Sequence, residues 1–210
     1  MKEKFLKNVA NHQMAIKLNR DFYRHLVFRN PKCSFDWFEI VTWPGSLAIT
    51  GDMGTYVFSR TEDMFRFFRG HKEPNLGYWA EKVQAGASGG RSSVKEFSFR
   101  KLKEVLIDNL RETDLDSLPG GSRAKIFRAL REDLFDTLGD YDSSHEEAHR
   151  LVHEFEYEGE QVFPDSFELD FTEFTIHFQW CCWAILWGIE RYDKTIGQLQ
   201  QVLFKTEVAQ

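Results

Sequence analysis

The residues best suited to chemistry lie in one short motif, HEEAH at residues 145–149. It matches H-E-x-x-H, in which two histidines one helical turn apart, here His145 and His149, bind zinc while the glutamate activates water. Residues 140–144, Asp-Tyr-Asp-Ser-Ser, lack the apolar turn that holds such a helix in a core. We therefore interpret these side chains as solvated, and keep a zinc-dependent hydrolase as the alternative.

The segment around this motif is strongly acidic. Residues 132–173 contain 15 Asp and Glu against a single Arg150, whereas residues 1–131 contain 23 Lys and Arg against 15 acids. This change in charge balance between neighbouring segments predicts two surfaces of opposite charge. The acidic segment is either solvated, docked on the basic part of its own chain, or exposed to a basic partner. The candidate partner-binding acids are Asp133, Asp136, Asp140, Asp142, Glu146, Glu147, Glu154 and Glu156.

A basic stretch at residues 91–111 points to a different class of partner. Its cations could contact the phosphates of DNA or RNA, although the net charge of −6 argues against direct nucleic-acid binding. The glycine-rich residues 86–92 lack the lysine and the preceding strand of a phosphate-binding loop. Cys181 and Cys182 have no second cysteine pair with which to hold a metal, so we expect no cofactor.

Any such site must be supported by the most apolar stretch, residues 174–189. Trp180, Trp183 and Trp187 follow an i, i+3, i+7 spacing, which places them on one helical face. The stretch is shorter than the roughly 20 apolar residues of a membrane span, so it predicts a central buried helix and no membrane segment. Residues 174–180 also alternate as a strand would, and that alternative stays open.

Around this helix the sequence predicts an α+β fold. Strands expected at 22–28, 35–42, 47–50 and 56–58 form an N-terminal antiparallel β-meander of about four strands, with helices packed on it. A capping-box pattern at 59–62 precedes one of the helices, which are expected at 2–19, 64–70, 74–81, 98–111, 122–138, 143–157 and 192–204. The C-terminal half is thus mostly helical. We expect one domain over 1–210, with a subdivision into a sheet-containing part (1–90) and a mainly helical part (91–210) as the alternative.

Three stretches carry a family resemblance: WPGSLAITGDMGTYVFSR at 43–60, NLGYWAE at 75–81 and WCCWAILWGIERYD at 180–193. Together they resemble a family of proteins encoded by bacteriophages and prophages. The resemblance implies no particular activity and no functional residues. It does imply a setting in which small proteins often bind a host protein, as anti-CRISPR inhibitors of bacterial defence do.

The charged N-terminus does not resemble a signal peptide, and three cysteines do not make a disulfide framework, so we expect the host cytoplasm. We predict a phage-encoded, non-enzymatic protein that inhibits a host nucleic-acid-handling or defence complex. In this hypothesis its acidic surface binds a basic, nucleic-acid-binding surface of that complex.

Overall fold

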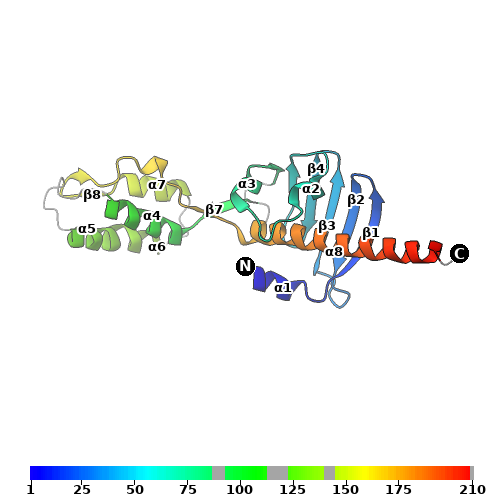
Figure 1. The fold of residues 1–210 in the computed structure, drawn as a ribbon. Coiled ribbons are helices and arrows are strands. Elements are labelled where there is room, and N and C mark those ends of the chain that lie inside the picture. Colours follow the sequence, from blue (N-terminus) through cyan, green and yellow to red (C-terminus); the bar gives the residue numbers. More distant parts are fainter. Residues whose placement is uncertain (87–92, 113–122, 140–144, 209–210) are drawn as a thin grey trace. The chain divides into compact units, whose positions relative to one another are not determined.

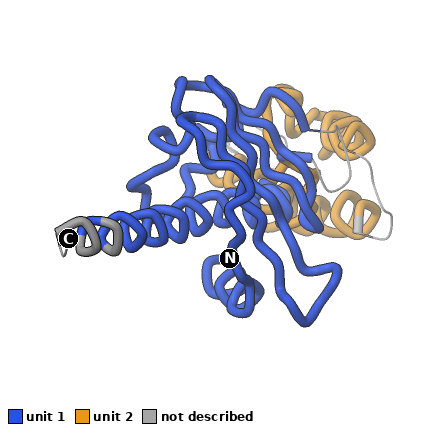
Figure 2. Tube along the Cα trace, turned by 90° about the vertical axis from the view of Figure 1, so that its right-hand side faces the viewer, with its two compact units in different colours: residues 1–94, 174–210 blue, residues 95–173 orange. Residues whose placement is uncertain are grey.

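The structure, a computed structural model, describes residues 1–86, 93–112, 123–139 and 145–208. Figures 1 and 2 show two units, which we call the sheet unit (1–94 with 174–210) and the helical unit (95–173). The predicted α+β class is confirmed. The predicted boundary near residue 90 lies close to the first junction between the units. The C-terminal helix, expected in the helical part, instead packs with the sheet.

The sheet unit is built on an antiparallel meander of six strands that follow one another in sequence order (Figure 1). The strands are β1 (Gln13–Arg20), β2 (Tyr23–Arg29), β3 (Trp37–Trp43), β4 (Ser46–Gly51), β5 (Tyr56–Ser59) and β6 (Val83–Ala85). The four predicted strands correspond to β2 to β5. Gly51 and Gly54, at φ 153° and 106°, permit the tight connection between β4 and β5.

The helix predicted over residues 2–19 is wrong beyond its first turns. Helix α1 (Lys2–Asn8) ends early, and residues 13–20 form the edge strand β1. Only Met14 and Ile16 of this strand pack against the core. Two partly buried side chains give too weak an alternation to identify an edge strand, whose pairing with β2 overrides local propensity.

Helix α8 (Ile176–Val208) crosses one face of the sheet (Figure 1) and confirms the buried Trp-rich helix. It joins the helices predicted at 174–189 and 192–204 into one, because nothing in the intervening residues breaks a helix. The alternative of a strand over residues 174–180 is wrong: only Phe174 lies in a strand, at the end of the short β10 (Thr172–Phe174), and residues 176–180 belong to α8. Thr175 ends that strand and caps α8, since its Oγ1 accepts a hydrogen bond from the Phe178 N–H at 3.1 Å.

Every short helix of the sheet unit packs on the side of the sheet that α8 covers. Phe5 of α1 contacts Trp180 edge to face, with ring centroids 5.2 Å apart. Helices α2 (Met64–Phe68) and α3 (Leu76–Ala80) contribute Phe65, Phe68 and Trp79 to the same core. Asp63 caps α2 by accepting a hydrogen bond from the Phe65 N–H, so the predicted capping box at 59–62 is wrong. The remaining face of the sheet carries none of the described helices.

The helical unit has its own apolar core. Its elements are β7 (Lys95–Phe97), α4 (Phe99–Glu112), α5 (Arg123–Ala129), the π-helical segment η3 (Leu130–Phe135), α6 (Asp136–Gly139), α7 (His145–His153), β8 (Glu156–Tyr157), β9 (Glu160–Gln161) and the 3-10 helix η4 (Ser166–Glu168). Strand β7 pairs with β10, and β8 with β9. Ser98 caps α4 as predicted, through the Lys101 N–H at 3.1 Å. The starts predicted at Ser122 and at residues 143–144 lie outside the described residues.

His12 is a buried polar residue at the margin of the sheet unit's core. Its side chain is 0% exposed, and its Nε2 lies 3.4 Å from Asp36 Oδ1 without hydrogen-bond geometry. Burial lowers the pKa of His12, against the opposing influence of the Asp36 and Asp52 carboxylates. The imidazole is therefore held neutral in the folded protein at neutral pH.

Acidification from about pH 7.5 to pH 5 is expected to destabilise the sheet unit through His12. The unfolded state binds a proton at the ordinary histidine pKa, whereas the folded state resists protonation until the pH is lower. Stability is therefore lost as pH falls, with a slope of at most about 1.4 kcal/mol per pH unit for this one proton. Thermal unfolding at several pH values checks this, with His12→Phe expected to flatten the dependence. An unchanged slope in that variant would contradict the assignment.

Candidate functional site

The H-E-x-x-H motif occupies the first turns of α7, and its two histidines do meet. The Nε2 atoms of His145 and His149 lie 3.1 Å apart, with ring centroids at 4.5 Å. The His149 ring packs against Phe171, at 4.6 Å between centroids. Burial, with the neighbouring His145, lowers the pKa of His149. A neutral imidazole is the form that binds metals, so this pair resembles two of the ligands of a zinc site.

A third ligand does not join them. Within the described ranges, no group of three or more His, Cys, Asp or Glu is arranged to hold a metal ion. The carboxylate of Glu173, downstream of the motif, binds Ser98 and Arg100. His153 turns toward Gln161, whose Nε2 lies 3.1 Å from its Nδ1. The geometry therefore gives little support to the zinc-dependent hydrolase.

The acids predicted to bind a partner are divided between two parts of the helical unit. Asp133 and Asp136 lie on η3 and α6, whereas the others that are described lie on α7 or next to it (Glu146, Glu147, Glu154 and Glu156). In Figure 1, α4 runs between α6 and α7. All six are exposed, and Asp140 and Asp142 lie outside the described residues. The structure thus gathers the later acids and leaves Asp133 and Asp136 on a separate element.

Two of the gathered acids are neutralised within the helix. Arg150 binds Glu147 at 2.7 Å and Glu154 at 2.5 Å, and these bonds raise the pKa of its guanidinium. Both are exposed pairs on the helix surface, where solvent screens the attraction between the charges, so they contribute little to stability. Arg150, the one cation of the acidic segment, therefore pairs with acids on or next to its own helix and forms no ion pair with the strands that follow.

Those strands form an exposed acidic hairpin. Glu158 and Gly159, at φ 52° and 84°, form the two-residue turn between β8 and β9, and the strands bring Glu156 and Glu160 beside it. These three glutamates are exposed, and no Lys or Arg within the described parts of the chain forms an ion pair with them. Gln161 anchors the hairpin to α7 through the His153 carbonyl at 2.6 Å. We call Glu156, Glu158 and Glu160 the hairpin acids.

The two units carry net charges of opposite sign. Residues 95–173 carry 21 acids and 10 Lys or Arg, a net charge of −11, and the rest of the chain carries 12 acids and 17 Lys or Arg, a net charge of +5. The helical unit is therefore acidic as a whole, although its first helix is basic by composition. Each unit therefore presents a surface with one predominant sign of charge to a partner.

The cations of the basic stretch 91–111 are largely occupied. Lys95 binds Asp170 at 2.7 Å, and with Thr172 it lowers the pKa of that carboxyl. Arg100 pairs with Glu104 and Glu173, and Arg111 with Asp108 at 2.9 Å. Lys103 lies over the Phe99 ring, 4.1 Å from its centroid, and Arg91 is not among the described residues. This stretch offers few free charges to a phosphate backbone.

The comparisons with known proteins were made at three levels. No family model, no curated protein and no solved structure matches this chain. Among the helices of the described ranges, none combines the length and apolar character needed to cross a bilayer.

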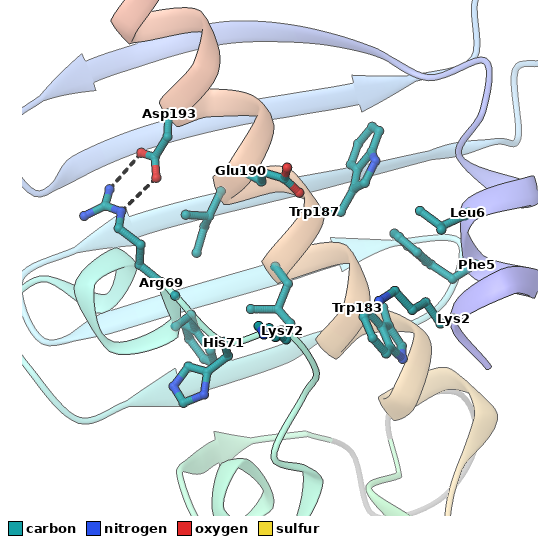
Figure 3. A pocket seen from close by; sticks show the side chains of 14 residues that line it. Lys2, Phe5, Leu6, Arg69, His71, Lys72, Trp183, Trp187, Glu190 and Asp193 are labelled. Carbon is teal, nitrogen blue, oxygen red and sulfur yellow. Dashed lines mark hydrogen bonds and ion pairs between the residues drawn. The ribbon is translucent and has the colours of Figure 1, made fainter.

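A hollow of about 450 Å³ in the sheet unit was missed by sequence reasoning (Figure 3). Figure 3 shows α1, α8 and the segment after α2 around it, with Trp183 and Trp187 among its walls. Its charges are mostly paired: Arg69 forms two 2.8 Å bonds with Asp193, and Lys2 lies 5.3 Å from the Trp183 ring centroid. The lining suits an apolar group and brings together no acid, base and nucleophile for catalysis.

Proposed function

We propose that this chain is a non-enzymatic binding protein whose acidic helical unit docks on a basic, nucleic-acid-binding surface of another protein. The observation that carries the proposal is the net charge of −11 on that unit, set against +5 on the sheet unit. Complementary charge accelerates encounter and selects partners, more than it adds raw affinity. A basic channel is the natural complement of such a unit.

The hairpin acids are the part of the helical unit best suited to contact that channel. Glu158 is exposed in the tight two-residue turn and Glu156 and Glu160 on the strands beside it, so the hairpin holds their backbone in place without help from a partner. Asp165 and Glu168, around η4, are exposed as well. Nucleic-acid-binding surfaces bind a row of phosphates with Lys and Arg, and a row of carboxylates competes for the same cations.

The resemblance to phage-encoded proteins extends the proposal to the identity of the partner. We propose that it is a host complex that handles nucleic acid, such as a defence complex, which this chain inhibits as anti-CRISPR proteins do. Occupation of the nucleic-acid channel is sufficient for inhibition, so the proposal requires no catalytic residue. It also does not depend on metal binding by His145 and His149.

The test is capture of a partner from a nuclease-treated bacterial lysate, followed by its displacement. We expect the captured protein to be released by added DNA or RNA, and by raising NaCl from about 0.05 to 0.5 M, because salt screens exposed charge pairs. A partner that stays bound under both conditions would refute a charge-based contact with a nucleic-acid-binding surface.

Reversal of the hairpin acids by Glu156→Lys, Glu158→Lys and Glu160→Lys is expected to weaken that complex by about two orders of magnitude at low salt. This corresponds to about 1 kcal/mol for each reversed charge. The matched control reverses Glu132, Asp133 and Asp136, which are exposed acids on η3 and α6 of the same unit. We expect the control to bind nearly as the parent does. Equal losses in both triple variants would assign the effect to net charge instead of the hairpin.

A further inference from the structure

The sheet face opposite α8 is uncovered in the part of the chain that the structure describes. The helices of the sheet unit pack on the other face, as the contacts of Phe5 with Trp180 and of Phe65 with Tyr192 show. The strand residues that point away from α8 do not belong to the core cluster; Val27 and Val41 are examples. We call this surface the open face.

The strand register arranges the open face into rows. At one end, Arg20 lies opposite Tyr23, and Trp43 lies opposite Ser46. Tyr23 and Trp43 are themselves neighbours, because the next pair along β2 and β3 is Arg24 with Thr42. The row at this end therefore places an arginine, a tyrosine and a tryptophan side by side.

The opposite end of the open face also places an arginine beside a tryptophan. Arg29 lies between Gln13 and Trp37 in the register, and its guanidinium is 5.6 Å from the Trp37 ring centroid. Trp37 and Trp43 are the first and last residues of β3, so the two aromatic ends are separated by about 20 Å of strand.

Most side chains in the middle of the open face are small, and its charged group is paired. One row aligns His25, Val41, Ala48 and Val57 across four strands. The carboxylate of Glu39, in the neighbouring row, is paired with the His25 Nε2 at 2.9 Å. Leu18 of β1, which is 45% exposed, lies opposite His25 at the edge of this row. Over β3 to β5 the row consists of the smaller residues Val41, Ala48 and Val57, on which a flat ligand can lie.

The remaining charge on the open face is positive. Arg20 and Arg29 are exposed, and neither has a carboxylate partner among the described residues. The sheet unit as a whole has a net charge of +5. Tyr23 and Trp43 are exposed and Trp37 is half-buried. Aromatic rings with arginines beside them, on an open antiparallel sheet, match what single strands need: stacking surfaces for bases and cations for phosphates.

We propose that the open face of the sheet binds single-stranded nucleic acid, with bases stacked on Tyr23, Trp43 and Trp37 and phosphates held by Arg20 and Arg29. This is a second surface, separate from the acidic one, and it does not rest on the function proposed above. Stacking tolerates any base, so the site discriminates poorly between sequences, and its affinity falls steeply with salt.

The experiment measures fluorescence anisotropy of labelled oligo-dT and oligo-U, each of about 12 nucleotides, with the full chain at low salt. We expect binding of at least one of them, weakened about tenfold by Trp43→Ala and again by Tyr23→Ala, since each removes a stacking surface. Trp43→Phe keeps a ring and is expected to retain most of the affinity. Phe35→Ala, at a ring that is 81% exposed outside the strands, is the matched control and should bind as the parent does.

Three results would overturn the proposal. The first is no binding of either oligonucleotide at low salt. The second is equal weakening by Phe35→Ala and Trp43→Ala, which would mean that the rings of the open face are not the site. The third is a dimer in light scattering that Tyr23→Ala and Trp43→Ala dissociate, because the open face would then belong to a second copy of this chain.

Discussion

Replacing Asp63 with alanine is expected to lower the free energy of unfolding of the sheet unit by about 3–5 kcal/mol. Asp63 Oδ1 accepts a hydrogen bond from Arg24 Nη1 at 2.8 Å and another from the Phe65 N–H at 3.0 Å. Arg24 lies on the core side of β2, its side chain is 10% exposed, and its guanidinium packs over the Phe65 ring at 4.6 Å. Without Asp63, this buried cation has no counter-ion and α2 has no cap.

Two further variants separate these effects in urea unfolding. Asp63→Asn can still cap α2, a contribution of about 1 kcal/mol, while it removes the charge that Arg24 needs. Arg24→Met removes the buried cation and keeps an apolar chain against Phe65, so we expect a smaller loss, of about 1–2 kcal/mol. The order Asp63→Ala, then Asp63→Asn, then Arg24→Met is the expected ranking of losses. If Arg24→Met were the most damaging, the pair would be stabilising in itself and our account would be wrong.

The inner strands could be predicted because both of their determinants are local. In β3, the alternation of Phe38 and Ile40 with more polar residues gives a period of two, and the glycines at 51 and 54 mark a tight turn. The edge strands lack such signals. Strand β1 buries too little to show its period, and β6 has three residues, so both exist because a neighbouring strand offers them hydrogen bonds.

The division into units depended on contacts that sequence patterns do not encode. Helix α8 begins beyond residue 175, yet its Tyr192 donates a hydrogen bond to Asn19 of β1 at 2.8 Å. The helical unit is thus an insertion between β6 and α8, and the acidic segment forms only part of it. The segment's composition showed an excess of acid, but only the structure showed which acids share an element.

The same limit applies to the open face. Alternation alone places Tyr23 and Trp43 on the side of their strands away from Leu26 and Ile40. Alternation does not show whether a helix covers that side of the sheet. That depends on where the helices pack, which is determined by contacts between segments distant in sequence. The histidines of the H-E-x-x-H motif show the converse: their spacing predicted that they would meet, but a third ligand requires a segment distant in sequence.

Helix α8 approaches the sheet closely at Gly188. A Cβ built on Gly188 would lie 2.7 Å from Ile40 Cδ1 and 3.1 Å from Phe28 Cζ. The Phe28 ring cannot move aside freely, because it is stacked on Phe38 with centroids 4.5 Å apart. A residue larger than glycine must therefore displace the end of the Ile40 side chain and crowd the Phe28 ring, or shift α8 away from the core that it covers.

Gly188→Leu is therefore expected to destabilise the sheet unit by at least about 3 kcal/mol, through overpacking against Phe28 and Ile40. Gly188→Ala should lose less, since the gain in helix propensity, about 1 kcal/mol, offsets part of the strain. Gly197→Ala is the matched control in the same helix: no atom lies within 4 Å of its added Cβ, so we expect stabilisation by about 0.5–1 kcal/mol. Thermal and urea unfolding measure all three. Similar effects at Gly188 and Gly197 would mean that α8 does not pack on the sheet as closely as this geometry requires.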